Sequence, residues 1–217
     1  MILFGTPTYD KSVTLDYHTS LLQSTHLLSQ RGVDWTTHVV AGKCFIDLAR
    51  NEIVHAFLHS GASDLLFVDA DVGWDPKVLP RLLNYPHGVV AGLVPKRDAE
   101  SDATFHQNAL TGVIDQGLFQ SLEAPTAFMR IKRSVFQRLD EAYPELARAD
   151  RESKFTPYFQ TGIKNGGFLG EDIFFCRQWC ALGEFIWIDP DISFSHRGSR
   201  VWKGNFYDHC KATGLLR

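Results

Sequence analysis

The sequence predicts an α/β domain with a mostly parallel central sheet flanked by helices. Over about the first hundred of its 217 residues, apolar strand-like runs alternate with helix-like stretches, an order typical of strand–helix–strand units. Hydrophobic residues make up 44% of the chain and charged residues 22%, ordinary values for a globular protein with a buried core. We expect a single domain over residues 1–217, with a regular half of about 1–100 and an irregular half of about 101–217.

The elements of the regular half are expected from apolar spacing and from the residues that end each run. The expected strands are at 2–4 (followed by a turn at 5–10), 34–40, 65–68 and the later part of 75–97. The expected helices are at 15–32, 47–61 and the start of 75–97. The inward side of the second helix is expected to carry Leu48, Ile53, Val54, Phe57 and Leu58.

The irregular half is expected to begin with a strand that runs into a helix within 126–139. A glycine-rich loop at 156–172 then leads into a helix at 172–183, and a strand–turn–strand unit follows at 185–198. The remaining residues, 199–217, are basic and aromatic.

Composition excludes several classes of protein. The net charge of −3 argues against a protein that coats nucleic acid electrostatically. No run approaches the roughly 18 apolar residues of a transmembrane helix, and the start lacks the basic segment of a signal peptide. We therefore expect a soluble cytoplasmic protein. The four cysteines form no C-x-x-C pair; Cys176 and Cys180 share a helix face, and buried free thiols are expected rather than a metal site.

Two aspartates follow the buried strand 65–68 at a spacing of one residue. Asp69 and Asp71 have a structural explanation, because aspartates favour the ends of strands, where they bond nearby backbone N–H groups. Two carboxylates so close repel each other unless a cation lies between them. A hard divalent ion such as Mg²⁺ or Mn²⁺ binds such oxygens and keeps positions for phosphate. The pattern therefore favours a metal site at Asp69 and Asp71.

A second acidic pair, Glu171 and Asp172, opens the helix expected after the glycine-rich loop. Carboxylates at a helix N-terminus complement the helix dipole, so a structural role is as plausible as a catalytic one. The functional interpretation is that one of them accepts a proton from an attacking hydroxyl.

His196 follows a short strand late in the chain. A lone histidine is usually a surface or packing residue, but it suits Mn²⁺ as a third ligand beside carboxylates. The neighbouring cations, which could neutralise phosphate, are Arg197, Arg200 and Lys203.

The segment 49–76, "ARNEIVHAFLHSGASDLLFVDADVGWDP", resembles the nucleotide-sugar half of GT-A glycosyltransferases. The later segments "FMRIKRSVFQRL", "GEDIFFCRQWCALG" and "VWKG" are similar to short, family-2-like glycosyltransferases of bacteriophages and bacteria. The resemblance implies a GT-A (Rossmann-like) fold, a nucleotide-sugar half at about 1–100 and an acceptor half at about 101–217. It also implies a bacterial or phage-infected cytoplasm as the location.

The resemblance implies a role for each matching residue of the donor side. Thr6, Pro7 and Tyr9 would line the nucleoside pocket, and Arg50 with Asn51 would contact the base or orient the aspartates. The diphosphate and its metal would be held by Asp69, Asp71, His196, Arg200 and Lys203.

On the acceptor side, the resemblance implies Asp172 as the catalytic base and Glu171 as its support. The implied reaction is the transfer of a sugar, with inversion, from a nucleoside-diphosphate sugar to a hydroxyl. Relatives often carry "GTGF" where this chain has "PTAF" at 125–128, so the acceptor does not transfer with the resemblance. The candidates are a glycan, a lipid-linked sugar or a hydroxymethylated base in DNA.

A DNA acceptor would need cations for its phosphates. The two basic groups in question are Arg197, Arg200, Lys203 and Lys211, and Lys96, Arg97, Arg130, Lys132 and Arg133. We favour surface charges and diphosphate ligands as the interpretation of these groups.

Two other functions fit the same aspartates. A haloacid-dehalogenase-type phosphohydrolase would use Asp69 as nucleophile and Asp71 as acid, although that family places its motif near the N-terminus. A non-catalytic nucleotide-sugar-binding module would keep the fold without the chemistry.

Overall fold

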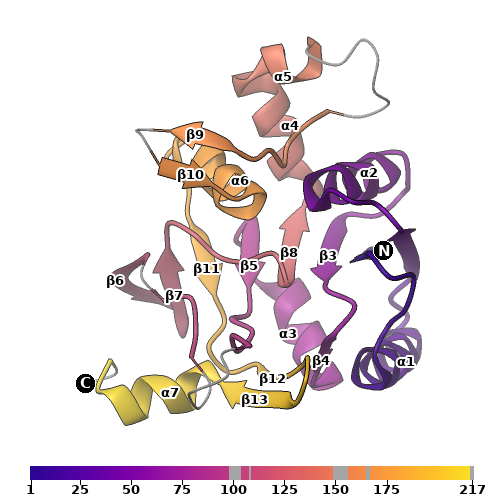
Figure 1. Ribbon diagram of the computed structural model, residues 1–217, viewed down its shortest axis with the longest axis vertical. Helices are drawn as coiled ribbons and strands as arrows, with labels where there is room; N and C mark the ends of the chain where they lie inside the picture. Colours follow the sequence, from indigo (N-terminus) through magenta and orange to yellow (C-terminus); the bar gives the residue numbers. More distant parts are fainter. Residues whose placement is uncertain (98–103, 108, 149–155, 165–166, 216–217) are drawn as a thin grey trace.

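The computed structural model describes residues 1–97, 104–107, 109–148, 156–164 and 167–215. Its centre is an eight-stranded sheet with helices on both faces (Figure 1). The strand order is β2-β1-β3-β8-β5-β11-β7-β6. In chain order these strands are β1 (Ile2–Thr8), β2 (Trp35–Ala41), β3 (Asp64–Val68), β5 (Val89–Ala91), β6 (Leu110–Asp115), β7 (Leu118–Ser121), β8 (Phe128–Lys132) and β11 (Ile186–Ile188).

The sheet is mixed rather than mostly parallel. Strands β2, β1 and β3 run parallel, as do β5 and β11, but β8 lies antiparallel between β3 and β5. Phe128, which begins β8, pairs with Val68, which ends β3. The chain therefore enters β8 at the same edge at which β3 delivers its aspartates.

Two small antiparallel sheets complete the architecture. One joins β4 (Val72–Trp74), β12 (Ser193–Arg197) and β13 (Val201–Asn205) in the order β13-β12-β4. The other is the hairpin of β9 (Gly162–Lys164) and β10 (Gly167–Leu169). The pairing of β4 with β12 brings the last third of the chain next to the aspartates.

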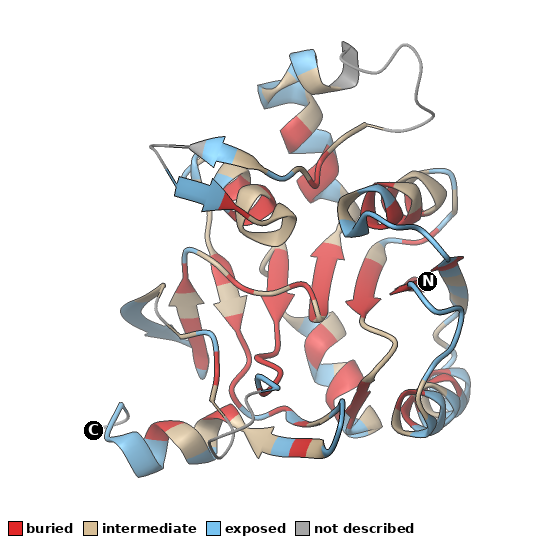
Figure 2. Cartoon of the chain, in the orientation of Figure 1, coloured by how far each residue is buried: buried red, intermediate tan, exposed pale blue. Residues whose placement is uncertain are grey.

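The helices divide between two hydrophobic cores, one on each face of the large sheet (Figure 2). The core that contains Ile2, Phe4 and Leu66 takes in α1 (Leu15–Gln30), the 3₁₀ turn η1 (Pro76–Val78) and α3 (Leu79–Asn84). The core that contains Leu3 and Phe67 takes in α2 (Ile46–Leu58), α4 (Arg133–Ala142), α6 (Glu171–Cys180) and α7 (Phe206–Thr213). A short helix, α5 (Pro144–Arg148), follows α4. Alternate strand residues thus face opposite cores, as the pleat requires.

Most of the expected elements are confirmed, with two local corrections. Strand β1 extends to Thr8 instead of turning at Gly5, because all seven of its residues are buried and paired with β2. Leu48 is 43% exposed rather than inward, because it lies in the first turn of α2, before that helix packs on the sheet. Among the described residues, no helix has the length and apolarity needed to cross a bilayer.

Two arginines that could have served DNA phosphates are structural. Arg133 donates to the carbonyls of Phe57, Leu58, Ser60 and Ala62, and so satisfies the open end of α2. Arg130 is fully buried and donates to carbonyls in the last turn of α3 and in the chain that follows it, at Leu82, Tyr85, His87 and Gly88.

The lysine between these two arginines has a similar role, since Lys132 donates to the carbonyl of Pro86 at 2.9 Å. Three of the five cations considered above as one basic group (Lys96, Arg97, Arg130, Lys132 and Arg133) therefore donate to backbone carbonyls.

Candidate functional site

The two aspartates lie in a short, braced loop between β3 and β4. The N–H of Asp69 donates to the carbonyl of Ala127 at 3.0 Å, and the N–H of Val72 donates back to the carbonyl of Asp69 at 3.1 Å. Thr14, which caps α1, donates through both its N–H (2.9 Å) and its hydroxyl (3.3 Å) to the carbonyl of Ala70. The loop therefore holds its two carboxylates in place before any ligand arrives.

Asp71 lies between an imidazole and a guanidinium. Its Oδ1 is 3.5 Å from Nε2 of His196, and its Oδ2 accepts a 2.6 Å hydrogen bond from Nη1 of Arg97. Its carbonyl accepts the N–H of Arg197 at 2.9 Å, next to the β4–β12 pairing that delivers the histidine. Burial acts to raise the pKa of Asp71, but the hydrogen bond and charge of His196 and the charge of Arg97 outweigh it and lower that pKa.

The hydrogen bonds of His196 favour metal binding. Its Nδ1 lies 2.7 Å from the carbonyl of Pro95, so Nδ1 carries the proton and donates. Nε2 faces Asp71: in the protonated ring it donates to that carboxylate, and in the neutral ring it offers a lone pair to a cation bound between the two side chains. A backbone carbonyl that orients the far ring nitrogen in this way is typical of metal-binding histidines.

Asp69 is linked through Arg50 to the other acidic pair. Nη2 of Arg50 is 3.5 Å from Oδ1 of Asp69, and its Nε is 3.3 Å from Oε1 of Glu171. The guanidinium also lies 5.8 Å from the ring centre of Phe67. Burial raises the pKa of Asp69 and of Glu171, and the charge of Arg50 opposes both shifts without cancelling them.

Asp172 belongs to the same cluster of charges. It lies in the first turn of α6, where its Oδ1 accepts the N–H of Ile173 at 2.8 Å. It is close enough to Asp69 for its charge to add to the rise in the pKa of Asp69, as do the charges of Asp71. The fold thus brings Asp69, Asp71, His196, Glu171 and Asp172 to one edge of the sheet.

A pocket of about 440 Å³ opens beside the aspartates. Its lining includes the ends of β1 and β3 and the start of α2. The lining residues are Pro7, Thr8, Tyr9, Asp10, Ser12, Thr14, Ile46, Arg50, Asp69, Ala70, Asp71 and Arg97. The predicted residues Pro7, Tyr9, Arg50, Asp69 and Asp71 therefore share one cavity.

Two of the predicted donor-site residues point elsewhere. Thr6 is fully buried and shares a 2.6 Å hydrogen bond with the hydroxyl of Tyr17. Asn51 is buried and forms two hydrogen bonds with the backbone of Phe159 (2.7 and 2.9 Å). Both are structural in this fold, because side chains alternate along a strand and rotate by about 100° per residue around a helix.

The two predicted cations of the hairpin also lie away from the 440 Å³ pocket. The guanidinium of Arg200 lies over the ring of Trp202, 4.8 Å from its centre. Lys203 pairs with Ser195, the neighbour of His196 in β12. Its side chain therefore lies on the opposite face of the β12–β13 hairpin from the side chain of His196.

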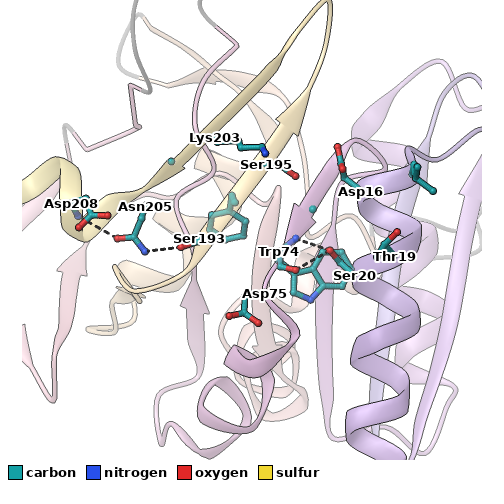
Figure 3. A pocket seen from close by; sticks show the side chains of 14 residues that line it. Asp16, Thr19, Ser20, Trp74, Asp75, Ser193, Ser195, Lys203, Asn205 and Asp208 are labelled. Carbon is teal, nitrogen blue, oxygen red and sulfur yellow. Dashed lines mark hydrogen bonds between the residues drawn. The ribbon is translucent and has the colours of Figure 1, made fainter.

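Lys203 instead lines a larger pocket, of about 650 Å³, between α1 and the β12–β13 hairpin (Figure 3). Asp16 and Thr19 face this pocket from α1, and Asn205 and Asp208 face it from the other wall. The Nη2 of Arg197 is 2.9 Å from Oδ2 of Asp16, and this ion pair lies beside the backbone that bonds Asp71. The larger pocket is lined by three aspartates and one cation, Lys203, whereas the 440 Å³ pocket has three aspartates and two arginines, so the smaller pocket suits a diphosphate better.

The donor set partly fits the predicted metal. Among the described residues, no group of three or more His, Cys, Asp or Glu side chains is arranged to hold an ion, so the expected trio of Asp69, Asp71 and His196 is not assembled as a closed site. The carboxylate of Asp71 and Nε2 of His196 do converge, and oxygen and imidazole donors suit Mn²⁺. Phosphate oxygens commonly complete such a coordination shell.

Sequence reasoning missed the pocket role of Arg97. We expected this residue only as one of nine cations that serve as surface charges or diphosphate ligands, without assigning it to the aspartates, yet its guanidinium binds Asp71 and lines the 440 Å³ pocket. The available signal was its position, because it follows the end of an apolar strand and strand ends gather ligands in α/β folds.

No protein-family model and no curated protein matches the sequence. Among solved structures, the chain is similar to A197 from STIV, with a TM-score of 0.54 and 17% identity over 91% of this chain and 85% of that chain. This likeness shows a shared fold, a mixed α/β domain.

Two further solved structures have lower scores. A glycosyltransferase involved in the glycosylation of the major capsid of PBCV-1 has a TM-score of 0.37 and 12% identity, over 70% of this chain and 68% of that chain. The 4-diphosphocytidyl-2C-methyl-D-erythritolsynthase from Anaerococcus prevotii has a TM-score of 0.36 and 11% identity, over 83% of this chain and 98% of that chain. Likenesses this weak carry no conclusion about activity, so the function is argued from the site.

Proposed function

We propose that this protein is a metal-dependent glycosyltransferase that moves a sugar from a nucleoside-diphosphate sugar to an acceptor hydroxyl. One observation carries the proposal: Asp71, which faces the imidazole of His196, lines a 440 Å³ pocket together with Asp69, and the carboxylate of Asp172 lies close enough to Asp69 to act on it by charge. A site of this kind offers cation ligands, room for a nucleotide and a proton acceptor together. The volume lies within the range of about 300–1,000 Å³ that is typical of small-molecule sites.

The donor would bind across the ends of β1 and β3. Pro7 and the exposed Tyr9 offer apolar surface to the nucleoside, and Thr8 is braced by its hydroxyl on the carbonyl of Ser12 at 2.7 Å. Arg50 orients Asp69, because its guanidinium is buried between that carboxylate and Glu171.

Asp71 and His196 would hold Mn²⁺ or Mg²⁺, which acts as a Lewis acid on the leaving diphosphate. Asp172 takes the proton of the acceptor hydroxyl, for which its carboxylate must lie within about 3 Å of that oxygen. Its Oδ1 already accepts an N–H, so Oδ2 is the oxygen that receives the proton. The acceptor oxygen bonds to the anomeric carbon, and the electron pair of the broken bond leaves on the diphosphate. A single displacement of this kind inverts the anomeric centre.

A saccharide or lipid-linked sugar is a better supported acceptor than a DNA base. Arg130, Lys132 and Arg133 donate to backbone carbonyls, and Lys203 lines a pocket rich in carboxylates. The cations that a DNA acceptor would need are thus largely committed elsewhere.

The test is a thermal-shift panel of UDP, GDP, CDP and TDP, each with and without Mn²⁺, on wild type, Asp71→Ala and Asp191→Ala. Asp191 is an exposed aspartate that lies outside the pocket, so its variant is the matched control. A ligand that binds the folded state raises the melting temperature. We expect one nucleotide to produce a Mn²⁺-dependent rise in wild type and Asp191→Ala but not in Asp71→Ala.

No shift with any nucleotide would contradict the proposal. An acid-stable phosphate adduct on Asp69 after incubation with phosphate esters would instead favour the phosphohydrolase. A nucleotide shift without any transfer or donor hydrolysis would favour a binding module.

A further inference from the structure

We infer that Arg97 is a built-in counter-ion of Asp71, which a divalent cation displaces and which then binds the diphosphate of the donor. This inference rests on the proposed function. It assigns Arg97 a role that cannot be predicted from the two aspartates alone.

The contact between Arg97 and Asp71 is the shortest charged contact of the site. Nη1 of Arg97 is 2.6 Å from Oδ2 of Asp71 and also donates to the carbonyl of Arg197 at 3.3 Å. Nε2 of His196 lies 3.5 Å from the other oxygen, Oδ1. One carboxylate thus faces an imidazole on one side and a guanidinium on the other, and the guanidinium holds a position next to the metal donors.

A cation and Arg97 therefore compete for Asp71. A divalent ion beside Oδ1 and Nε2 of His196 repels a guanidinium only one carboxylate away. The Arg97 side chain is 48% exposed, so it can leave Asp71 without disrupting packed neighbours. Within the described part of the chain, its other hydrogen bond is to the carbonyl of Arg197, which is neutral and does not replace the charge of Asp71.

The released guanidinium lies where the diphosphate is expected. Of the described residues that line the 440 Å³ pocket, Arg50 and Arg97 are the cations. Arg50 is nine-tenths buried and committed to Asp69 and Glu171. Arg97 is thus the exposed cation of this lining, and guanidinium groups bind phosphate oxygens with two parallel hydrogen bonds. Arg97 thus neutralises the carboxylate of Asp71 in the absence of metal. Once the metal is bound, it neutralises the diphosphate of the donor.

The proposal predicts opposite changes in two affinities. Removal of the guanidinium should strengthen the binding of Mn²⁺ alone, because no counter-ion has to be displaced, and weaken the binding of a diphosphate. We expect Arg97→Ala to bind Mn²⁺ about threefold to tenfold more tightly and the Mn²⁺–pyrophosphate complex at least about tenfold more weakly. The affinity of Arg97→Lys for Mn²⁺–pyrophosphate should fall between those of wild type and Arg97→Ala. Lysine keeps the positive charge but cannot form the two parallel hydrogen bonds of a guanidinium.

The experiment is a titration of Mn²⁺ followed by the electron paramagnetic resonance signal of the free ion, and a calorimetric titration of Mn²⁺–pyrophosphate. Both are run on wild type, Arg97→Ala, Arg97→Lys and Arg138→Ala. Arg138 is a matched control, since it is 46% exposed and paired with the carboxylate of Glu184 on a different part of the surface. The control should behave as wild type in both titrations.

Each result has a distinct meaning. Opposite shifts in Arg97→Ala support the exchange. Unchanged or weaker Mn²⁺ binding in Arg97→Ala, with normal binding in wild type and loss in Asp71→Ala, overturns the exchange but leaves the proposed metal site intact. If wild type and both Arg97 variants bind no Mn²⁺, the metal site of the proposed function fails and the exchange fails with it.

Discussion

The guanidinium of Arg50 and the carboxylate of Glu171 form a buried ion pair, 3.3 Å from Nε to Oε1, that joins α2 to the first residue of α6. Their side chains are only 6% and 12% exposed, and Asp69 lies on the other side of the same guanidinium. The pair therefore connects the loop that carries Asp69 and Asp71 to the helix that carries Asp172.

Loss of the cation should be costly, because it leaves two partly buried carboxylates uncompensated. We expect Arg50→Met to lower the free energy of unfolding by about 3 kcal/mol in urea denaturation at pH 7. The double variant Arg50→Met/Glu171→Gln should recover part of that loss. Arg138→Met, at an exposed ion pair, should change it by less than about 1 kcal/mol. Equal costs for Arg50→Met and Arg138→Met would contradict the bridging role.

Asp172→Asn should separate catalysis from donor binding. The amide keeps the size of the side chain and its acceptance of the Ile173 N–H, but it cannot take a proton at the pH of the assay. We expect transfer to fall by at least about a hundredfold, while the Mn²⁺-dependent nucleotide shift stays that of wild type. A loss of the nucleotide shift would make Asp172 a binding or folding residue instead.

The histidine of the site can be tested apart from turnover. His196→Ala removes Nε2 from beside Asp71 and should weaken Mn²⁺ binding by about tenfold or more. His209→Ala is a suitable control, because that histidine lies on α7 and bonds Gln107, and neither residue lines the pocket. Equal Mn²⁺ affinity in wild type and His196→Ala would remove the histidine from the ligand set.

Arg133 should prove structural and irrelevant to nucleic acid. Its replacement by methionine leaves four carbonyls at and beyond the end of α2 without their donor. We expect a loss of about 2–4 kcal/mol in the free energy of unfolding. Retention of any DNA affinity, measured at low salt on the folded variant, would agree with this role; its selective loss would revive the basic-patch interpretation.

The partly buried thiol of Cys180 predicts an alkaline limit to stability. Burial raises the pKa of Cys180 to about 11 from 9.0. Between these pH values the unfolded chain loses the proton that the folded chain keeps, so stability falls as the pH rises. Replacement of Cys180 by alanine should flatten this slope, whereas Cys44→Ala, at an exposed cysteine, should not. Identical slopes in all three proteins would show that the thiol of Cys180 does not cause the fall.

The order of elements could be predicted from the sequence because apolar spacing reports burial directly. Strand β3 and its two aspartates were expected at the position where they lie, since a buried run that ends in acidic residues indicates the edge of a sheet. The direction of a strand leaves no such pattern in its sequence. Strand β8 is antiparallel to both of its neighbours, β3 and β5, so the expectation of a mostly parallel sheet was only half correct.

The site residues show a similar division. Pro7 and Arg50 line the pocket as expected, but their sequence neighbours Thr6 and Asn51 turn towards Tyr17 and Phe159. A motif places a segment, whereas the register of the strand or helix decides which side chain of that segment points into the cavity. The contact of Arg97 with Asp71 is purely tertiary, and no local pattern announces it.

The hydrogen bond between His196 and the carbonyl of Pro95 spans 101 residues of chain. On a ribosome that adds about 5–20 residues per second, that separation is a delay of roughly five to twenty seconds between the synthesis of the two halves of the proposed ion-binding edge. The aspartates, their helices and much of the first core are thus made well before the strand that carries the histidine. A nascent chain can therefore begin to fold around β1 and β3 while it still lacks the imidazole, and the proposed metal site is complete only once the last strands have been made.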